Sequence, residues 1–246
     1  MKNLFIGKYL VIALCLLSVQ SLIAKDIYLS VNGADTNNGL SESGAVATLT
    51  KALSLIEDGD NIRVSGIIDV SKEVSGIEGV AMPQMAFSII GDSPSTSGFT
   101  GNGVTRIFNI NSNDKETQYK NLSFINGAQN QTKGSAVFIQ NSRSVFTNCI
   151  FKNNIAASCK GTVYLYTPNQ VEFYDCIFTD NQVQQGGAVF SEMRGRLVMD
   201  RCMITNCNLQ SVANSNGGGL QILGIESFVL KNSTVRNCSV AQRGGG

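Results

Sequence analysis

Five short segments in the second half of the chain share one pattern and recur at a nearly constant interval. They occupy residues 121–124, 148–151, 175–178, 201–204 and 232–235, and their last residues are 27, 27, 26 and 31 positions apart. Each is followed by a polar stretch, then by glycine, then by a short apolar run. A repeat of this period is typical of stacked arrays in which each unit contacts only its neighbours. The spacing therefore predicts a solenoid.

The content of each repeat indicates that the solenoid is built from strands. About 27 residues contain two or three short apolar runs. Because a strand rises roughly 3.3 Å per residue, such a repeat can close one turn and return one strand spacing higher. A β-sandwich would show hairpin signals about every 8–12 residues, and a helical solenoid would show a helical apolar period. We therefore predict an all-β, right-handed parallel β-helix in which equivalent residues stack in columns.

Residues 25–60, which follow the N-terminal segment, predict a cap for this solenoid. Residues 26–31 alternate as a strand does, and residues 48–56 place four apolar residues on one face of a short helix. A solenoid needs such a cap because its first turn otherwise exposes an apolar face and unpaired strand edges. The predicted organisation is a cap at 25–60, irregular coils at 61–118 and regular repeats at 119–246. Within the irregular coils we expect strands at 61–64, 66–70, 85–90 and 105–110, and an outward loop at 91–103.

Residues 1–24 have the pattern of a signal peptide. Lys2 and Lys8 form a basic start, and an apolar run of about ten residues follows at 10–19, with a cleavage site predicted after Ala24. That run is too short to span a bilayer stably, so export is favoured over a membrane anchor. We predict a protein exported to the cell surface or the extracellular space.

Composition excludes several function classes. Without Lys2 and Lys8, the chain has 17 basic and 18 acidic side chains, which gives a net charge of −1. Nucleic-acid binding is therefore not expected, because it needs a clustered positive surface. There is no histidine, which removes the commonest general base and metal ligand. No second long apolar run follows the signal peptide, so we expect no membrane span in the mature chain, and we expect no cofactor and no metal.

The cysteines fall into the register of the repeat. Cys149, Cys176 and Cys202 occupy one column, and Cys207 and Cys238 occupy another. An even number of cysteines in an exported chain is compatible with disulfides. The register favours buried thiols instead, because a free cysteine behaves as a small apolar residue and suits the interior of a solenoid. One or two disulfides remain the alternative.

Phenylalanine and asparagine recur together within the repeats. The Phe-x-x-Asn signature joins Phe151 to Asn154 and Phe178 to Asn181, and Phe124 begins the same phenylalanine column. We expect the rings to face inward and fill the interior. We expect each asparagine to satisfy backbone groups where the sheet bends.

A glycine pair precedes an apolar strand in two coils. Gly186-Gly187 and Gly218-Gly219 hold these positions. Glycine adopts backbone angles that other residues avoid, so both pairs predict a tight bend. Together with the phenylalanine and asparagine columns, and with Cys149, Cys176 and Cys202, these glycines are the repeat positions that we expect to build the structure.

These two signatures resemble the repeats of the chlamydial-type polymorphic outer membrane proteins, over residues 119–246. The resemblance implies a surface-exposed or secreted parallel β-helix with an adhesin-like role and a host surface or glycan as its ligand. It also implies anchoring through a C-terminal membrane barrel. The sequence stops at Gly246 where another strand is due, so we expect a fragment of a longer protein. Later coils depart from the pattern, with Ile204 and Val235 in the phenylalanine column.

A polysaccharide lyase or glycoside hydrolase of the same fold is the alternative. Asp175 and Arg201 hold equivalent positions in adjacent coils and predict an exposed ion pair worth under about 1 kcal/mol. Glycosidases need two carboxylates at a defined separation, which a sequence does not display. We therefore assign no catalytic residue. The candidates for such chemistry are Glu172, Asp175, Asp180, Glu192, Asp200, Arg194, Arg196 and Arg201.

Two further motifs have a functional and a structural interpretation. Residues 35–39 place oxygen ligands at alternating positions as a calcium loop does, but lack its distant glutamate, so an asparagine-rich turn is favoured. Tyr164, Tyr166 and Tyr174 lie close in sequence, and on an outer face they would stack on sugar rings. We expect some of them to face inward and some to cover the surface.

Overall fold

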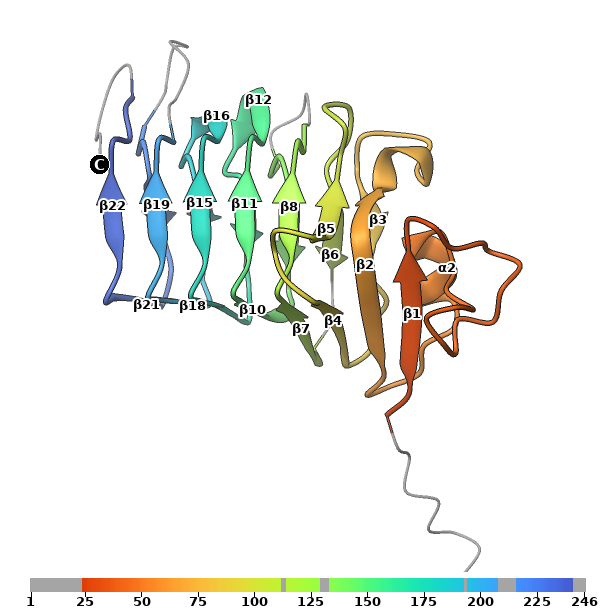
Figure 1. Cartoon of the computed structure of the whole chain (residues 1–246). Helices are drawn as coiled ribbons and strands as arrows, with labels where there is room; N and C mark the ends of the chain where they lie inside the picture. Colours follow the sequence, from red (N-terminus) through yellow and green to blue (C-terminus); the bar gives the residue numbers. More distant parts are fainter. Residues whose placement is uncertain (1–23, 112–113, 129–132, 193, 208–215, 241–246) are drawn as a thin grey trace, which may run out of the picture.

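The structure is a computed structural model in which parallel strands wind into a β-helix (Figure 1). The chain forms three faces, which we call A, B and C, and the strands of each face pair in parallel with their equivalents one turn away. Face C takes one strand from each of six successive turns. The predicted signal peptide lies outside the described residues except for Ala24. Described are residues 24–111, 114–128, 133–192, 194–207 and 216–240.

Face A and face B share the long strand β2, whose first half pairs on face A and whose second half pairs on face B. Face A contains β1 (Asp26–Ser30), β2 (Asn61–Asp69), β4 (Phe87–Gly91), β7 (Glu116–Lys120), β10 (Arg143–Thr147), β14 (Gln170–Tyr174), β18 (Arg196–Asp200) and β21 (Ser227–Lys231). Face B continues from β2 with β5 (Ser97–Thr100), β8 (Ser123–Ile125), β11 (Ile150–Lys152), β15 (Ile177–Thr179), β19 (Met203–Thr205) and β22 (Thr234–Arg236).

Face C returns the chain to the start of the next turn. It contains β3 (Val80–Ala81), β6 (Phe108–Asn111), β9 (Val137–Gln140), β13 (Val163–Tyr166), β17 (Val189–Glu192) and β20 (Leu220–Leu223). Between faces B and C, two turns add a small sheet of β12 (Ile155–Lys160) and β16 (Gln182–Gln185).

The register confirms the repeat predicted from the sequence. Phe124 pairs with Phe151, Phe151 with Phe178, Phe178 with Ile204, and Ile204 with Val235. Every one of these pairs is parallel, as a coil that climbs one strand spacing per turn requires. The fold is therefore the parallel β-helix that the spacing predicts.

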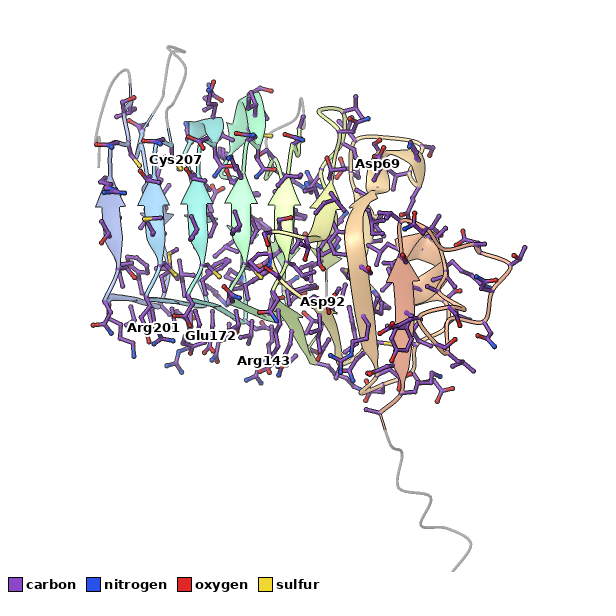
Figure 2. All side chains as sticks on the ribbon, in the orientation of Figure 1. Asp69, Asp92, Arg143, Glu172, Arg201 and Cys207 are labelled. Atoms are coloured by element: carbon purple, nitrogen blue, oxygen red, sulfur yellow. The ribbon has the colours of Figure 1, made fainter. Side chains whose placement is uncertain are left out.

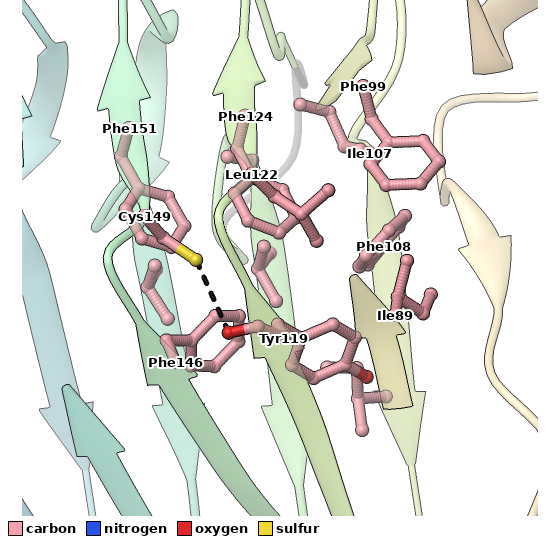
Figure 3. Packing of buried hydrophobic residues seen from close by; sticks show 14 of the residues in the cluster. Ile89, Phe99, Ile107, Phe108, Tyr119, Leu122, Phe124, Phe146, Cys149 and Phe151 are labelled. Atoms are coloured by element: carbon pink, nitrogen blue, oxygen red, sulfur yellow. Dashed lines mark hydrogen bonds between the residues drawn. The ribbon is translucent and has the colours of Figure 1, made fainter. Parts of the chain in front are cut away.

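Stacked aromatic rings fill the interior (Figure 3). The ring centroids of Phe124 and Phe151 are 4.8 Å apart at 9° between the planes, and those of Phe151 and Phe178 are 4.6 Å apart at 5°. Tyr119 stacks on Phe146 from face A at 4.7 Å, and Phe124 meets Phe146 edge-on at 5.9 Å. Among these four rings and Phe178, rings within a column stack and rings of different columns meet edge-on, both favourable arrangements of aromatic quadrupoles.

Residues with a left-handed backbone turn the chain at the corners between faces. Between faces A and B, the equivalent residues of five turns have φ from 51° to 56°. After face B, a second column of five residues has φ from 52° to 57°. Apart from glycine, asparagine and aspartate are the residues that tolerate this conformation best, which explains their abundance in the repeats. The two columns are Asn121, Asn148, Asp175, Arg201 and Asn232, and then Asn126, Asn153, Asp180, Asn206 and Asn237.

The N-terminal end is closed by helix α2 (Leu49–Leu53), which lies beside β1 and β2 (Figure 1). Leu49 and Ala52 are buried in the core of the solenoid. The helix is shorter than the predicted 48–56. Ser54 accounts for this end, because its hydroxyl donates to the carbonyl of Lys51 at 2.7 Å and competes with continued helix.

The outward loop predicted at 91–103 is wrong in its second half, where β5 pairs with β2 and β8. Glycine and serine indicated a loop, but they serve close packing here. A Cβ atom on Gly98 would lie 2.2 Å from the carbonyl oxygen of Ser123, so only glycine fits this strand position. Two other strands also begin later than predicted, β4 at Phe87 and β6 at Phe108.

Candidate functional site

The outer side of face C is occupied by its own aromatic column. Phe138, Tyr164 and Phe190 point outward in successive turns, yet they are only 4%, 5% and 1% exposed. Lys133 stands over the Phe138 ring at 5.1 Å, and Lys160 of β12 stands over the Phe190 ring at 4.9 Å. These rings are sealed by cation–π contacts and are not available to stack on a ligand.

The three tyrosines that lie close in sequence do not form one cluster. Tyr164 and Tyr166 both belong to β13 on face C, with ring centroids 6.4 Å apart. Tyr174 ends β14 on face A. Tyr164 and Tyr166 are two positions apart in one strand and therefore lie on the same side of it. Because β13 and β14 belong to different faces, the three tyrosines do not form one surface on which a sugar could stack.

Face A presents its outward side chains to solvent along successive turns. Figure 2 shows Arg143, Glu172 and Arg201 on the same side of the solenoid, whereas Cys207 lies at the opposite side. Arg143 pairs with Gln170, and Gln170 with Arg196, so the two arginines lie two strand spacings apart, about 10 Å. Both arginines are exposed. We therefore take face A as the candidate site.

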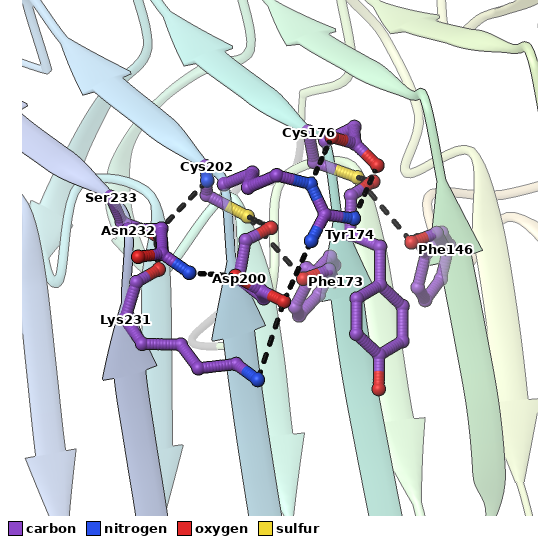
Figure 4. A network of polar contacts seen from close by, with 11 residues as sticks. Phe146, Phe173, Tyr174, Cys176, Asp200, Cys202, Lys231, Asn232 and Ser233 are labelled. Atoms are coloured by element: carbon purple, nitrogen blue, oxygen red, sulfur yellow. Dashed lines mark hydrogen bonds and ion pairs between the residues drawn. The ribbon is translucent and has the colours of Figure 1, made fainter.

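A network of charges crosses three turns at the end of face A (Figure 4). Arg201 donates to both carboxylate oxygens of Asp175, at 2.7 and 2.8 Å, and to Asp200 at 2.8 Å. Asn232 donates to Asp200 at 3.0 Å, and the Nζ atom of Lys231 lies 3.4 Å from it. The predicted Asp175–Arg201 pair is therefore present and bidentate, the geometry for which the guanidinium group is suited.

These contacts keep the aspartates ionised. The hydrogen bond from Arg201 holds the pKa of Asp175 below its ordinary value. The hydrogen bond from Asn232, followed by the charges of Arg201 and Lys231, does the same to the pKa of Asp200. A carboxyl group held in its charged form recognises hydrogen-bond donors but is poorly suited to act as a general acid near neutral pH.

Glu172 is partnered in the same way at the centre of the face. The hydroxyl of Tyr174 donates to one carboxylate oxygen at 2.9 Å, and Gln170 donates to the other at 2.5 Å. The hydrogen bond to Glu172 raises the pKa of Tyr174, so the phenol stays protonated. Face A thus contains carboxylates, an amide and a phenol whose positions are set by contacts between neighbouring residues.

The other charged candidates lie elsewhere around the solenoid. Glu192, at the end of β17 on face C, accepts a hydrogen bond from Tyr164 at 2.6 Å and lies 3.5 Å from Lys160. Asp180, in the corner after face B, accepts from Asn206 at 3.2 Å. The structure therefore does not bring the predicted carboxylates into one cleft. Within the described part of the chain, no group of three His, Cys, Asp or Glu side chains is placed to hold a metal ion.

Two adjoining hollows run along the corner where face C turns into face A. Asn169 lines both, and their cavity volumes are about 580 and 370 Å³. Thr167 donates to Asn141 at 2.6 Å, and Asn169 donates to Asp114 at 3.2 Å, which fixes the walls. We call these hollows the corner groove. Its lining residues are Asp114, Asn141, Arg143, Tyr166, Thr167, Pro168, Asn169, Gln170, Arg194, Gly195 and Glu226.

The corner groove was not predicted from the sequence. The sequence feature that indicates it is a single glycine. Gly195 has φ of 86°, and a Cβ atom there would lie 1.7 Å from the carbonyl oxygen of Pro168. The backbone at this corner therefore approaches closely only because residue 195 is glycine. A lone glycine after Arg194 does not stand out among the 25 glycines of the chain.

The predicted asparagines form a buried ladder. Asn154 donates to the carbonyl of Phe124 at 3.0 Å, and Asn181 donates to that of Phe151 at 3.0 Å. The Asn154 side chain also accepts from the Gly127 amide at 2.7 Å, and Asn181 accepts from the Asn154 amide at 3.0 Å. The side chains thus bridge turns from inside, while the residue before each of them makes the left-handed corner.

The predicted glycines divide into two roles. Gly186 and Gly217 are equivalent and have φ of 60° and 64°. A Cβ atom on Gly187 would lie 2.1 Å from the carbonyl oxygen of Gly218, so this pair serves close approach. Gly219 comes one position after Gly218 and is equivalent to Ala188 of the preceding turn. It is therefore not part of the tight bend that we predicted for the pair Gly218-Gly219, because the left-handed residue of this turn is Gly217.

The cysteines line the interior as free thiols. Cys149, Cys176 and Cys202 donate to the carbonyls of Tyr119, Phe146 and Phe173 at 3.4 to 3.5 Å. Figure 4 shows the contacts of Cys176 and Cys202. Burial raises the pKa of Cys176. All cysteines of the described residues are buried and none is in a disulfide. The column of Cys149, Cys176 and Cys202 packs in the main core as apolar side chains do.

The calcium-like segment near the N-terminus is tied to the cap. The carboxylate of Asp35 accepts from the amides of Ala47 and Thr48 at 2.9 Å and from the Thr48 hydroxyl at 2.7 Å. Asn38 accepts from the Leu40 amide at 3.0 Å, which makes an asparagine turn. These oxygens organise the entry to α2.

The winding of the three faces and the open face A define a β-helix protein with an extended polar surface. Residues 106–246 match the family described as Right handed beta helix region. The match covers more than half of the chain, and the protein belongs to that family. Comparisons with curated proteins and with solved structures gave no match. Among the described residues, no helix is long and apolar enough to cross a membrane.

Proposed function

We propose that this protein is exported and acts as an adhesin-like binding protein, whose ligand is a glycan on a host surface. The observation that carries the proposal is the outer surface of face A, where β7, β10, β14, β18 and β21 present outward side chains one strand spacing apart over five turns. The two flanking columns of this surface are polar, and the central column contains Val145, Val198 and Val229. Such a surface offers contacts at a regular spacing along one direction. An extended ligand that meets several turns at once gains affinity through effective concentration.

The residues of face A and of the corner groove suit polyhydroxylated ligands. Gln170 and Glu172 offer planar hydrogen-bonding groups, and Tyr166 adds a half-buried ring at the groove wall. Arg143 and Arg196 are exposed and have the fork geometry that recognises carboxylate or sulfate groups. Most side chains that line the corner groove are polar or charged, which suits a hydroxyl-rich ligand better than an apolar one.

Binding is favoured over sugar cleavage because the carboxylates are already engaged. Asp175 and Asp200 are held ionised by Arg201 and Asn232. A glycosidase needs one carboxyl group with a raised pKa as its acid. The resemblance of the repeats to the polymorphic outer membrane proteins supports a role at the cell surface.

The test compares two charge-reversal variants of the whole chain. Arg143→Glu with Arg196→Glu changes face A, and Lys152→Glu with Arg236→Glu changes exposed positions of face B by the same charge. Binding would be measured on cultured epithelial cells and on immobilised heparin, hyaluronate and a neutral galactan. We expect the face A variant to bind at least about tenfold more weakly, a loss of about 1.4 kcal/mol, and the face B variant to bind as the parent does.

Two results would contradict the proposal. Equal loss from both variants would show that charge in general, and not face A, carries binding. Release of reducing or unsaturated sugar ends from polygalacturonate, with or without calcium, would replace binding by catalysis.

Export has its own measurement. Expression of the complete sequence in a host with a secretion pathway should yield a mature protein that begins at Lys25. An intact Met1 on a protein that remains inside the cell would contradict the export proposal while leaving the binding test unaffected.

A further inference from the structure

The second cysteine column holds two thiols in adjacent turns at the C-terminal end. Thr205 pairs with Arg236, and the amide of Asn206 donates to the carbonyl of Arg236 at 3.4 Å. Cys207 and Cys238 follow these residues at equivalent positions. Neighbouring parallel strands are about 4.8 Å apart. That spacing falls within the roughly 4.4–6.8 Å between Cα atoms that a disulfide spans.

Both thiols belong to the main buried core of the solenoid. Cys207 donates to the carbonyl of Thr205 at 3.5 Å, and Cys238 donates to that of Arg236 at 3.4 Å. Their shared hydrogen bond raises the pKa of Cys207 and lowers the pKa of Cys238 to about 7. Cys238 is therefore the thiol of the pair that is more readily ionised, and the thiolate is the reactive form.

The first cysteine column differs in access. Cys149 and Cys176 are fully buried, with further turns packed on both sides. Cys238 is 6% exposed and belongs to the last described turn, where Phe228 and Leu230 of β21 are 38% and 40% exposed although they continue the inward columns of β18. Among the described residues, the core beside Cys238 is therefore more exposed than the core beside Cys149 and Cys176, and exposed parts of a core open more readily.

We propose that Cys207 and Cys238 form a disulfide that locks the last described turn of the β-helix onto the preceding one. The oxidant is a small disulfide, for which oxidised glutathione serves as the probe. The Cys238 thiolate attacks one sulfur of the oxidant and releases one thiolate, leaving a mixed disulfide. Cys207 loses its proton and attacks the Cys238 sulfur, which releases the second thiolate. Two protein thiols and one oxidant thus become one protein disulfide and two small thiols.

The cross-link stabilises the last described turn of the solenoid. It closes the segment between Cys207 and Cys238, which includes β20, β21 and β22. Opening of the last turn then no longer separates it from the turn below, because a cross-link restricts the unfolded segment. This inference rests on the register of the cysteines and not on the proposed binding function.

The experiment uses the reduced full chain, treated with oxidised glutathione and then digested with trypsin. Trypsin leaves Cys202 and Cys207 on one peptide, residues 202–231, and Cys238 on residues 237–243. We expect these two peptides to be joined in the parent and in the Cys202→Ser control. Cys207→Ser should keep the glutathione adduct on Cys238, and Cys238→Ser should lack the cross-link. The urea midpoint of the oxidised parent should exceed that of the reduced parent.

Three outcomes would overturn the proposal. These are a cross-link that disappears in Cys202→Ser, a glutathione adduct that persists on Cys238 in the parent, and a chain that keeps all its thiols under conditions that oxidise a reduced dithiol peptide. A cross-link that forms without any rise in the urea midpoint would overturn the stabilising role. Cys149→Ser serves as a second control, because its thiol belongs to the other column and should not affect the reaction.

Discussion

Replacement of Asn181 by alanine tests the mechanism by which the turns are held together from inside. Asn181 is fully buried, and its Oδ1 atom accepts from the backbone amide of Asn154 at 3.0 Å and from the Asn154 side chain at 2.9 Å. Its own amide donates to the carbonyl of Phe151 at 3.0 Å. Alanine removes these contacts without supplying any other partner.

The expected cost follows from the groups that are left unpaired. Two donors of Asn154 lose their acceptor inside the core, where an unsatisfied polar group costs about 1–3 kcal/mol. The variant Asn181→Ala should therefore lower the free energy of unfolding by about 2–6 kcal/mol. Because each turn of a solenoid contacts only its neighbours, the loss should be concentrated around Asn154 and Asn181.

Equilibrium unfolding in urea, followed by circular dichroism, measures the total loss, and amide hydrogen exchange locates it. The control is Asn153→Gly, which changes an exposed neighbour at φ of 55° where glycine fits without strain. Its stability should stay within about 0.5 kcal/mol of the parent. If Asn181→Ala loses less than about 1 kcal/mol, or no more than the control, the buried ladder does not hold the turns together.

Gly186→Ala should destabilise the protein by at least about 1–2 kcal/mol, because φ is 60° and the new Cβ would lie 2.8 Å from the carbonyl oxygen of Val189. Gly76→Ala, whose Cβ would meet nothing within 4 Å, should be neutral or slightly stabilising in the same urea titration, and equal effects would refute the argument. Asp175→Asn should be less stable than the parent at neutral pH, because the folded-state pKa of Asp175 is depressed by Arg201. That contribution is complete above the ordinary pKa of 3.8 and is lost as pH falls through the lower folded value, so the melting temperatures should converge in acid; a gap unchanged by pH would contradict the assignment.

The architecture was readable from the sequence because one physical requirement is repeated in every turn. A residue such as Phe151 must fit both Phe124 below it and Phe178 above it, so the same kind of side chain recurs at the length of one turn. The short cap helix was predictable for a related reason, since its apolar face at Leu49 and Ala52 must cover the first turn. Its length was not predictable, because the end at Ser54 depends on a single hydroxyl contact.

The candidate site was less accessible to sequence reasoning. The Asp175–Arg201 pair follows from the repeat alone, since equivalent residues of adjacent turns become neighbours. Asp200 contacts Arg201 because the two residues are adjacent in sequence. Lys231 and Asn232 contact Asp200 from the next turn, and that turn has 31 residues instead of 27, so the regular spacing does not predict these contacts. The corner groove depends on the close approach of the backbones of Gly195 and Pro168. No local sequence pattern predicts that these two residues lie together.

The sequence by itself determined that this chain coils as parallel strands and which side chains fill its interior, because alternation along a strand and the period of the repeat are both properties of the linear chain. Only the tertiary structure decided which outward residues share a face. That outcome depends on the angle of each left-handed corner and on the length inserted between faces. Tyr164 and Tyr174 are ten positions apart. The corner between their strands nevertheless places Tyr164 in the buried aromatic column of face C and Tyr174 on the outer surface of face A.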